Sequence, residues 1–179
     1  MGAVQNGKRC GAIADFTSFS FHAVKNLTTA EGGAATWRDI EGVDNEALYK
    51  QFMLLSLHGQ SKDALAKTQL GAWEYDIVAP YFKCNMTDIM AALGLAQLEQ
   101  LEHFITVKND NYTYYQEQGI KLLPFRKDIR TNAWFYSFMT EKRDDLIRYL
   151  SEHKIQSRPV WDLICSLRPY EHCRSYKIE

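Results

Sequence analysis

A long amphipathic helix is predicted in the middle of the chain, and the other elements must be arranged around it. Apolar residues recur there at intervals of three or four, which is the spacing of one helix face. They are Met90, Leu93, Leu98, Leu101, Phe104 and Ile105. The pattern predicts a helix that begins near Asn85 or Thr87, either of which can cap it, and that runs to about Gln118.

Before this helix, the sequence predicts a strand pair and a shorter helix. Aromatic residues alternate with small polar ones over residues 16–21, which favours a short strand, and residues 34–40 can return beside it after a glycine turn. Residues 45–55 have helical apolar spacing, and either Asp44 or its neighbour can cap them. Residues 56–85 are expected to be irregular because glycines and a proline interrupt them.

After the long helix, a strand–helix–strand unit is predicted. The apolar run 133–139 is typical of a buried strand, and residues 146–153 have the spacing of an amphipathic helix with Thr140 as its cap. Residues 155–160 are expected to form a last strand, which Pro159 confines to an edge. The order of elements predicts an α/β chain.

The composition excludes several classes of protein. With 46% hydrophobic and 13% aromatic residues the chain can bury a core, so it is not a disordered chain. Lysine plus arginine is 21 and aspartate plus glutamate is 22, a balance that predicts neither nucleic acid nor an anionic membrane as partner. No apolar run approaches the roughly 18 residues of a membrane span, and the first residues lack the apolar core of a signal peptide. A cytoplasmic protein is therefore expected.

The cysteines give no sign of a metal site. None of the four forms a CxxC pair, and free, mostly buried thiols are expected in a reducing compartment. Cys165, His172 and Cys173 lie close together in sequence, but their spacing fits no common zinc site. Ordinary packing is the favoured interpretation, and no metal is predicted.

The stretch FSFHAVKNLTTAEGG, residues 19–33, contains the strongest candidate for chemistry. Lys25 follows an apolar strand on a short loop, and a lysine amine acts as a nucleophile when it is deprotonated and positioned. Ser20 precedes it by five residues and has a hydroxyl that can donate to a phosphate, and two glycines permit close backbone approach. From this chemistry alone, a structural or solvated loop lysine remains the favoured interpretation.

The string SFSFHAVKNLTTAEGGAATW resembles the lysine segment of the DegT/DnrJ/EryC1/StrS family, the sugar aminotransferases that use pyridoxal phosphate (PLP). The matching residues are Ser20, Lys25, Glu31, Gly32 and Gly33. A second block, residues 85–102, resembles the helix that follows in the family, and the resemblance covers nearly the whole chain. The ending, residues 155–176, looks most like members that aminate UDP-linked 4-keto-6-deoxy sugars.

The resemblance implies part of a fold-type I PLP aminotransferase. Residues 1–85 would be the C-terminal part of the PLP-binding large domain, residues 86–125 a long connecting helix, and residues 126–179 part of the small C-terminal α/β domain. About half of the family's chain has no counterpart here. The chain alone is therefore expected to be an incomplete, inactive enzyme that persists by oligomerising.

The resemblance also implies roles for five residues. Lys25 would form the internal Schiff base with PLP and then carry protons as a free amine. Ser20 would bind the PLP phosphate, and Asn85 would reach the phosphate of the cofactor in the neighbouring subunit, which implies a homodimer or a higher homo-oligomer. His58 and Arg158 would contact a nucleotide-sugar. For these two, an ordinary loop histidine and a surface ion pair explain the residues equally well.

The implied function is transfer of an amino group, with glutamate as donor, to a nucleotide-linked keto-sugar of bacterial surface polysaccharide or glycan synthesis. One alternative is a catalytically inactive oligomeric interaction module derived from this family. Another is a PLP-dependent sugar dehydratase, which Lys25 disfavours because dehydratase relatives carry histidine at that position.

Overall fold

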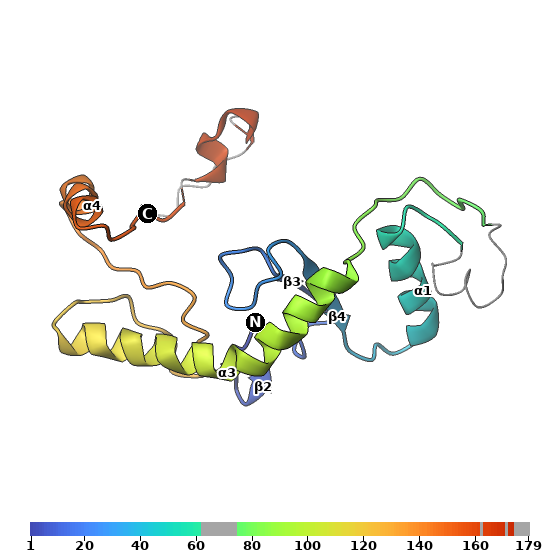
Figure 1. The fold of residues 1–179 in the computed structure, drawn as a ribbon, viewed down its shortest axis with the longest axis horizontal. Helices are drawn as coiled ribbons and strands as arrows, with labels where there is room; N and C mark the ends of the chain where they lie inside the picture. The colour runs from blue at the N-terminus through green and yellow to red at the C-terminus, as the bar shows by residue number, and fades with distance from the viewer. Residues whose placement is uncertain (62–74, 162, 171, 174–179) are drawn as a thin grey trace. The chain divides into compact units, whose positions relative to one another are not determined.

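The computed structural model describes residues 1–61, 75–161, 163–170 and 172–173 (Figure 1). The chain divides into two compact units. Unit 1 comprises Met1–Thr113 and Phe125–Trp134, and unit 2 comprises Tyr114–Pro124 and Phe135–Glu179. The family domains predicted from the sequence, with boundaries after residues 85 and 125, stay a prediction, because these units are defined by contacts within this chain alone.

A small antiparallel sheet opens unit 1. Strands β1 (Val4–Gln5) and β2 (Lys8–Arg9) form a hairpin, and β5 (Ile129–Arg130) pairs with the other side of β1. The hairpin turn is Asn6–Gly7, with φ values of 49° and 76°. Positive φ at both central positions is what a type I′ two-residue hairpin turn requires, so the Asn-Gly pair is a local sequence signal for this hairpin.

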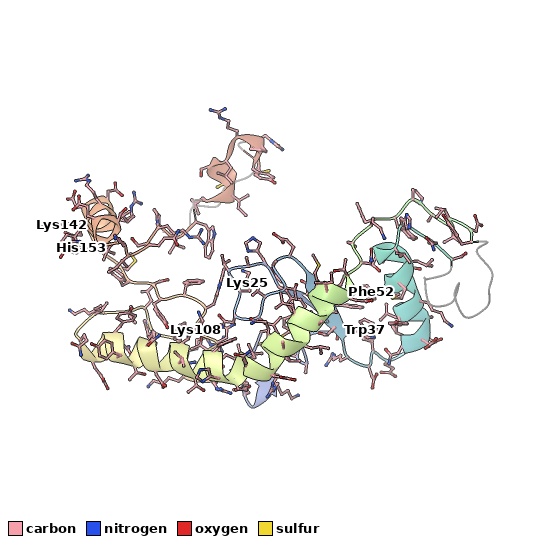
Figure 2. All side chains as sticks on the ribbon, in the orientation of Figure 1. Lys25, Trp37, Phe52, Lys108, Lys142 and His153 are labelled. Carbon is pink, nitrogen blue, oxygen red and sulfur yellow. The ribbon has the colours of Figure 1, made fainter. Side chains whose placement is uncertain are left out.

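The predicted strand pair and first helix are confirmed. Strands β3 (Phe16–Ser20) and β4 (Gly33–Trp37) run antiparallel, with Ser20 opposite Gly33. Helix α1 (Asn45–Ser56) follows, and the Asp44 carboxylate caps it by accepting the Glu46 N–H at 2.9 Å. The ring of Trp37 stacks on that of Phe52, 5.0 Å between centroids, which joins the strand pair to α1 (Figure 2).

The long helix is also confirmed, as α3 (Asp88–Glu117). Thr87 caps it, because the Met90 N–H donates to the Thr87 hydroxyl at 3.4 Å. Leu101 and Ile105 are its buried residues, and they form the core of unit 1 with Phe21 and Leu27. Burial of this one stripe against residues 21–27 fixes how the segment after β3 lies on the helix.

The region between α1 and α3 is irregular where it is described. Two isolated antiparallel bridges, Leu57 to Lys83 and Gln60 to Ile77, join its two ends. Residues 62–74, which the sequence analysis also expected to be irregular, lie outside the described residues.

Unit 2 departs from the sequence prediction. It contains α4 (Arg143–Glu152) and two short 3-10 helices, η1 (Ile164–Ser166) and η2 (Arg168–Tyr170). The helix expected near residues 146–153 is thus confirmed. The strands expected at 133–139 and 155–160 are wrong. In the first of these segments the described residues form one isolated bridge, Leu122 to Phe138, and the second has no assigned strand.

The physical reason for both errors is pairing. An apolar, aromatic run has high strand propensity, but a strand exists only where a neighbouring chain completes its hydrogen-bond ladder. The cap expected for α4 is also wrong. The Thr140 hydroxyl accepts the Lys142 N–H at 3.2 Å, which forms a local turn, and the helix begins after Lys142 without a side-chain cap.

The cysteines are more exposed than expected. No disulfide joins the four, all of which the structure describes; Cys10, Cys84 and Cys173 are exposed and Cys165 is half-buried. Within the described parts of the chain, no group of three histidine, cysteine or carboxylate side chains could hold a metal ion. No helix of those parts is both long enough and apolar enough to cross a bilayer.

Candidate functional site

Residues 21–32, which connect β3 to β4, form a closed loop, here called the lysine loop. Its base is held by Phe21, whose N–H donates to the Gly32 carbonyl and whose carbonyl accepts the Thr29 N–H, both at 2.9 Å. The Thr28 hydroxyl also donates to the Phe21 carbonyl, at 3.1 Å. These hydrogen bonds continue the ladder of the strand pair, so the base of the loop is anchored to the sheet.

The glycine pair is required by this closure. Gly32 has φ +146°, and a Cβ there would lie 2.5 Å from the Thr29 hydroxyl oxygen. A Cβ on Gly33 would lie 2.6 Å from the Phe19 carbonyl oxygen, closer than real atoms approach. Thr29 is 1% exposed and donates its hydroxyl to the Glu31 carbonyl at 2.6 Å. The Glu31-Gly32-Gly33 part of the motif thus contributes through its backbone, by allowing the close approaches that close the loop.

Buried side chains fix the loop against α3. Leu27 is 3% exposed and packs in the cluster that contains Leu101 and Ile105. Asn26 is 7% exposed, and its amide nitrogen donates to the Asn132 carbonyl at 2.6 Å. Lys25 lies between these two buried residues and the exposed residues 22–24 of the loop.

Lys25 is half-buried and its amine lies against an aromatic ring. Its backbone N–H donates to the His22 carbonyl at 2.9 Å, which closes a tight turn. Its Nζ is 3.4 Å from the ring centroid of Trp134. The indole N–H of Trp134 in turn donates to the Val24 carbonyl at 2.8 Å. Among the described residues, no carboxylate forms an ion pair with Lys25.

An open depression of about 460 Å³ adjoins Lys25. The loop contributes Lys25 and Asn26, and one face of α3 contributes the rest. Figure 2 shows Lys25 on the loop and Lys108 on α3. Those helix residues are Gln97, His103, Phe104, Val107, Lys108 and Asn111. Among the described residues, two lysines and no carboxylate line this depression, so it favours anionic over cationic groups.

Ser20 ends β3 and is exposed. Its hydroxyl oxygen accepts the His22 N–H at 3.4 Å, a weak contact in which its own hydrogen remains available for donation. The His22 ring lies 3.6 Å from a Glu31 carboxylate oxygen across the loop. The structure thus brings Ser20, His22, Lys25 and Glu31 into the same loop and its strand end.

The other predicted site residues lie elsewhere. Asn85 is exposed in the segment just before α3. His58 is half-buried at φ +46°; its N–H donates to the Phe82 carbonyl, and its Nε2 lies 3.1 Å from the Gln60 amide oxygen. Arg158 belongs to unit 2, where its guanidinium carbon is 5.9 Å from the Trp161 ring centroid. Their roles at a site stay predictions.

Residues 1–178 match the model of the DegT/DnrJ/EryC1/StrS aminotransferase family. The chain belongs to this family. Its membership confirms the resemblance inferred from the lysine loop and the α3 block. Solved structures confirm the predicted fold class, an α/β chain that forms part of a fold-type I aminotransferase.

Relatives of this DegT/DnrJ/EryC1/StrS chain come from several organisms. The spore coat polysaccharide biosynthesis protein SpsC of Bacillus subtilis is 39% identical over 129 residues, which is 69% of this chain and 32% of that protein. An uncharacterized protein of Methanocaldococcus jannaschii, MJ1066, is 40% identical over 140 residues, 75% of this chain and 34% of that protein. The chain thus spans about a third of the length of these curated relatives.

Among solved structures, Spr1654 of Streptococcus pneumoniae, which is named as a sugar aminotransferase, has been determined in PMP and PLP forms. The PMP form has a TM-score of 0.85 and 44% identity, covering 96% of this chain and 45% of that chain. The PLP form has a TM-score of 0.83 and 39% identity.

Two residues that contact the lysine loop were not among the predicted site residues. Trp134 lies in the run interpreted as a buried strand, and Asn132 lies just before that run. They contact loop residues 110 and 106 positions away, respectively. A tryptophan indole N–H usually finds an acceptor when the ring is buried, but the sequence does not tell which one. No signal in the sequence identifies these contacts.

Proposed function

We propose that this chain carries the lysine side of the site of a PLP-dependent nucleotide-sugar aminotransferase, which moves an amino group from glutamate to a keto-sugar of surface polysaccharide synthesis. The observation that carries the proposal is the placement of Lys25: a half-buried amine on a closed loop, beside an open depression, without a carboxylate partner among the described residues. The PLP form of Spr1654 and the polysaccharide role in the name of SpsC support the cofactor and the pathway class.

The residues of the lysine loop fit PLP. An aldehyde needs an amine that is not committed to an ion pair, and a phosphate needs hydrogen-bond donors. Lys25 offers the first, and the exposed Ser20 hydroxyl at the end of β3 offers the second. PLP, when bound, supplies an electron sink for the bond changes at the substrate carbon.

The proposed residues have distinct tasks. Lys25 would hold the cofactor through its amine, and the same Nζ, when released, would take up and return the proton at the reacting carbon of the amino acid. Ser20 donates to the phosphate. Asn85 is proposed to reach the phosphate held by a second copy of the protein, so a complete site needs a homodimer. Its exposure just before α3 supports this assignment.

His58 and Arg158 are proposed as contacts to the nucleotide-sugar. Arg158 is exposed, and its planar guanidinium suits a diphosphate. His58 is engaged with Gln60, so it would contribute through the ring nitrogen that this contact leaves available.

Labelled-amine transfer tests the proposed function directly. The chain replaces its matched part in Spr1654, and this chimera is incubated with PLP, ¹⁵N-glutamate and a UDP-linked 4-keto-6-deoxy sugar. We expect the label to appear in the sugar, measured by mass spectrometry, because Lys25 and Ser20 complete the site. The same chimera without PLP is the control.

The two alternatives predict other results. A sugar dehydratase would consume the keto-sugar with loss of water and without ¹⁵N in the product. An interaction module would leave the sugar unchanged and take up no PLP at Lys25. Either result would overturn the aminotransferase assignment.

The Ser20 assignment predicts weaker cofactor binding in Ser20→Ala. Loss of one hydrogen bond to a charged phosphate weakens binding by about 10- to 150-fold. The measurement is a PLP titration of the chimera followed by absorbance. Ser18→Ala is the matched control, since Ser18 is an exposed serine two positions earlier on β3 and faces the same side of the strand pair. Equal affinities in the two variants would remove Ser20 from the phosphate site.

A further inference from the structure

The segment 131–134, far from the lysine motif in sequence, contacts three consecutive residues of the lysine loop. The indole N–H of Trp134 donates to the Val24 carbonyl at 2.8 Å. The face of the same ring lies 3.4 Å from the Lys25 Nζ. The Asn132 carbonyl accepts the Asn26 amide at 2.6 Å. The Trp134 ring is thus hydrogen-bonded at its indole N–H to Val24, while its face contacts the Lys25 amine. Two contacts of one ring with neighbouring loop residues define its orientation toward Lys25.

The segment 131–134 is itself held in place. The Asn109 side chain on α3 donates both to the Thr131 carbonyl, at 3.2 Å, and to the Ile105 carbonyl, at 2.8 Å. Ala133 is 1% exposed and adopts φ +44°, with its N–H donating to the Thr131 hydroxyl at 3.0 Å. A non-glycine residue rarely adopts this conformation, so the surrounding contacts must hold it there. The Trp134 ring thus has a fixed support.

The flanking residues strengthen this support. The Arg130 guanidinium lies 2.7 Å from a Glu102 carboxylate oxygen on α3. The hydrogen bond from Arg130 holds the pKa of Glu102 below its usual range, which favours the charged carboxylate that pairs with Arg130. The segment that bears Trp134 is therefore tied to the same helix that buries Leu27 of the lysine loop.

We propose that Trp134 is a positioning residue for Lys25, whose ring face holds the amine beside the depression whenever the amine is not bonded to the cofactor. An ammonium group over an indole face is attracted by the ring electrons. The contact with the Trp134 ring therefore favours one conformation of the Lys25 side chain when its amine is not bonded to the cofactor. This inference rests on the proposed function for the role of Lys25 as the cofactor lysine.

The test is the chemical reactivity of Lys25 in the cofactor-free chain. The lysines are methylated with formaldehyde and cyanoborohydride for short times, and the rate at Lys25 is compared with that at Lys50 by peptide mass spectrometry. We expect Trp134→Leu to raise the Lys25 rate about 2- to 30-fold, the range that corresponds to one lost cation–π contact. Trp134→Phe, which keeps a ring face, should give a smaller rise, and Trp161→Leu in unit 2 should give none.

Two results would overturn the proposal: an unchanged Lys25 rate in Trp134→Leu, or an equal rise in Trp161→Leu. If Trp134→Leu loses its helical circular dichroism, Trp134→Phe becomes the deciding variant. A higher methylation rate at Lys25 but not at Lys50 then supports the proposal, and an unchanged rate at Lys25 overturns it. PLP uptake by the chimera with Spr1654, fixed at Lys25 by borohydride, tests the proposed function separately. If no PLP is taken up but the methylation rate at Lys25 still depends on Trp134, the proposed function is overturned and the contact between Trp134 and Lys25 is supported.

Discussion

Lys25→Ala is expected to abolish covalent uptake of PLP, with complete loss of the lysine-dependent absorbance band and of the borohydride-fixed adduct. Transfer of labelled amine by the chimera should fall by at least about 10²- to 10⁴-fold, because the same amine is the proposed carrier of the proton. The stability of the chain should change little. The replaced side chain is half-buried and contacts one ring face, while the base of the lysine loop is held by the backbone of Phe21.

The matched control is Lys108→Ala, because Lys108 lines the same depression from α3. If positive charge in the depression were all that mattered, both variants would lose PLP to a similar degree. We expect Lys108→Ala to keep the covalent adduct. An adduct that survives in Lys25→Ala, or that moves to another lysine, would contradict the assignment of Lys25.

Ile105→Ala is expected to give the largest loss of stability, about 2–5 kcal/mol in the free energy of unfolding. Ile105 is 0% exposed and belongs with Phe21, Leu27 and Leu101 to the core cluster that joins the lysine loop to α3. Its truncation leaves a cavity that these neighbours cannot close fully. Urea unfolding followed by circular dichroism measures the effect.

Ile89→Ala on the same helix is the control. Ile89 is 84% exposed, so the same chemical change removes almost no buried surface there. Its free energy of unfolding should stay within about 0.5 kcal/mol of the original chain. Similar losses in both variants would show that the core of unit 1 does not lie where Ile105 is buried.

The predictable parts of the fold were those that local sequence determines. The strand pair β3–β4, α1 with its Asp44 cap, and α3 each carry their own periodicity or capping residue. The run 133–139 has equally strong apolar character, yet it forms no strand, because pairing depends on a partner that local sequence does not name. The hairpin at Asn6–Gly7 is the opposite case, because its signal is local but the hairpin was not among the predicted elements.

The candidate site divides in the same way. Ser20, Lys25 and the Gly32–Gly33 pair come from one continuous motif, so the sequence could predict them together. Trp134 contacts the same loop across 110 residues, and only the folded chain brings it there. A motif therefore identifies the reacting group, while the residues that orient the group depend on the tertiary structure.

The closed base of the lysine loop has a thermodynamic consequence for any ligand that meets Lys25. Ordering a backbone costs about 1–2 kcal/mol per residue in conformational entropy. Here the N–H and the carbonyl of Phe21 are both hydrogen-bonded within the loop, and Leu27 is buried. The loop backbone is therefore already ordered when the chain has folded. A cofactor that binds at Lys25 has to order only the lysine side chain, because the lysine loop is already ordered. Less of the binding free energy is then lost to conformational entropy, and the affinity is higher.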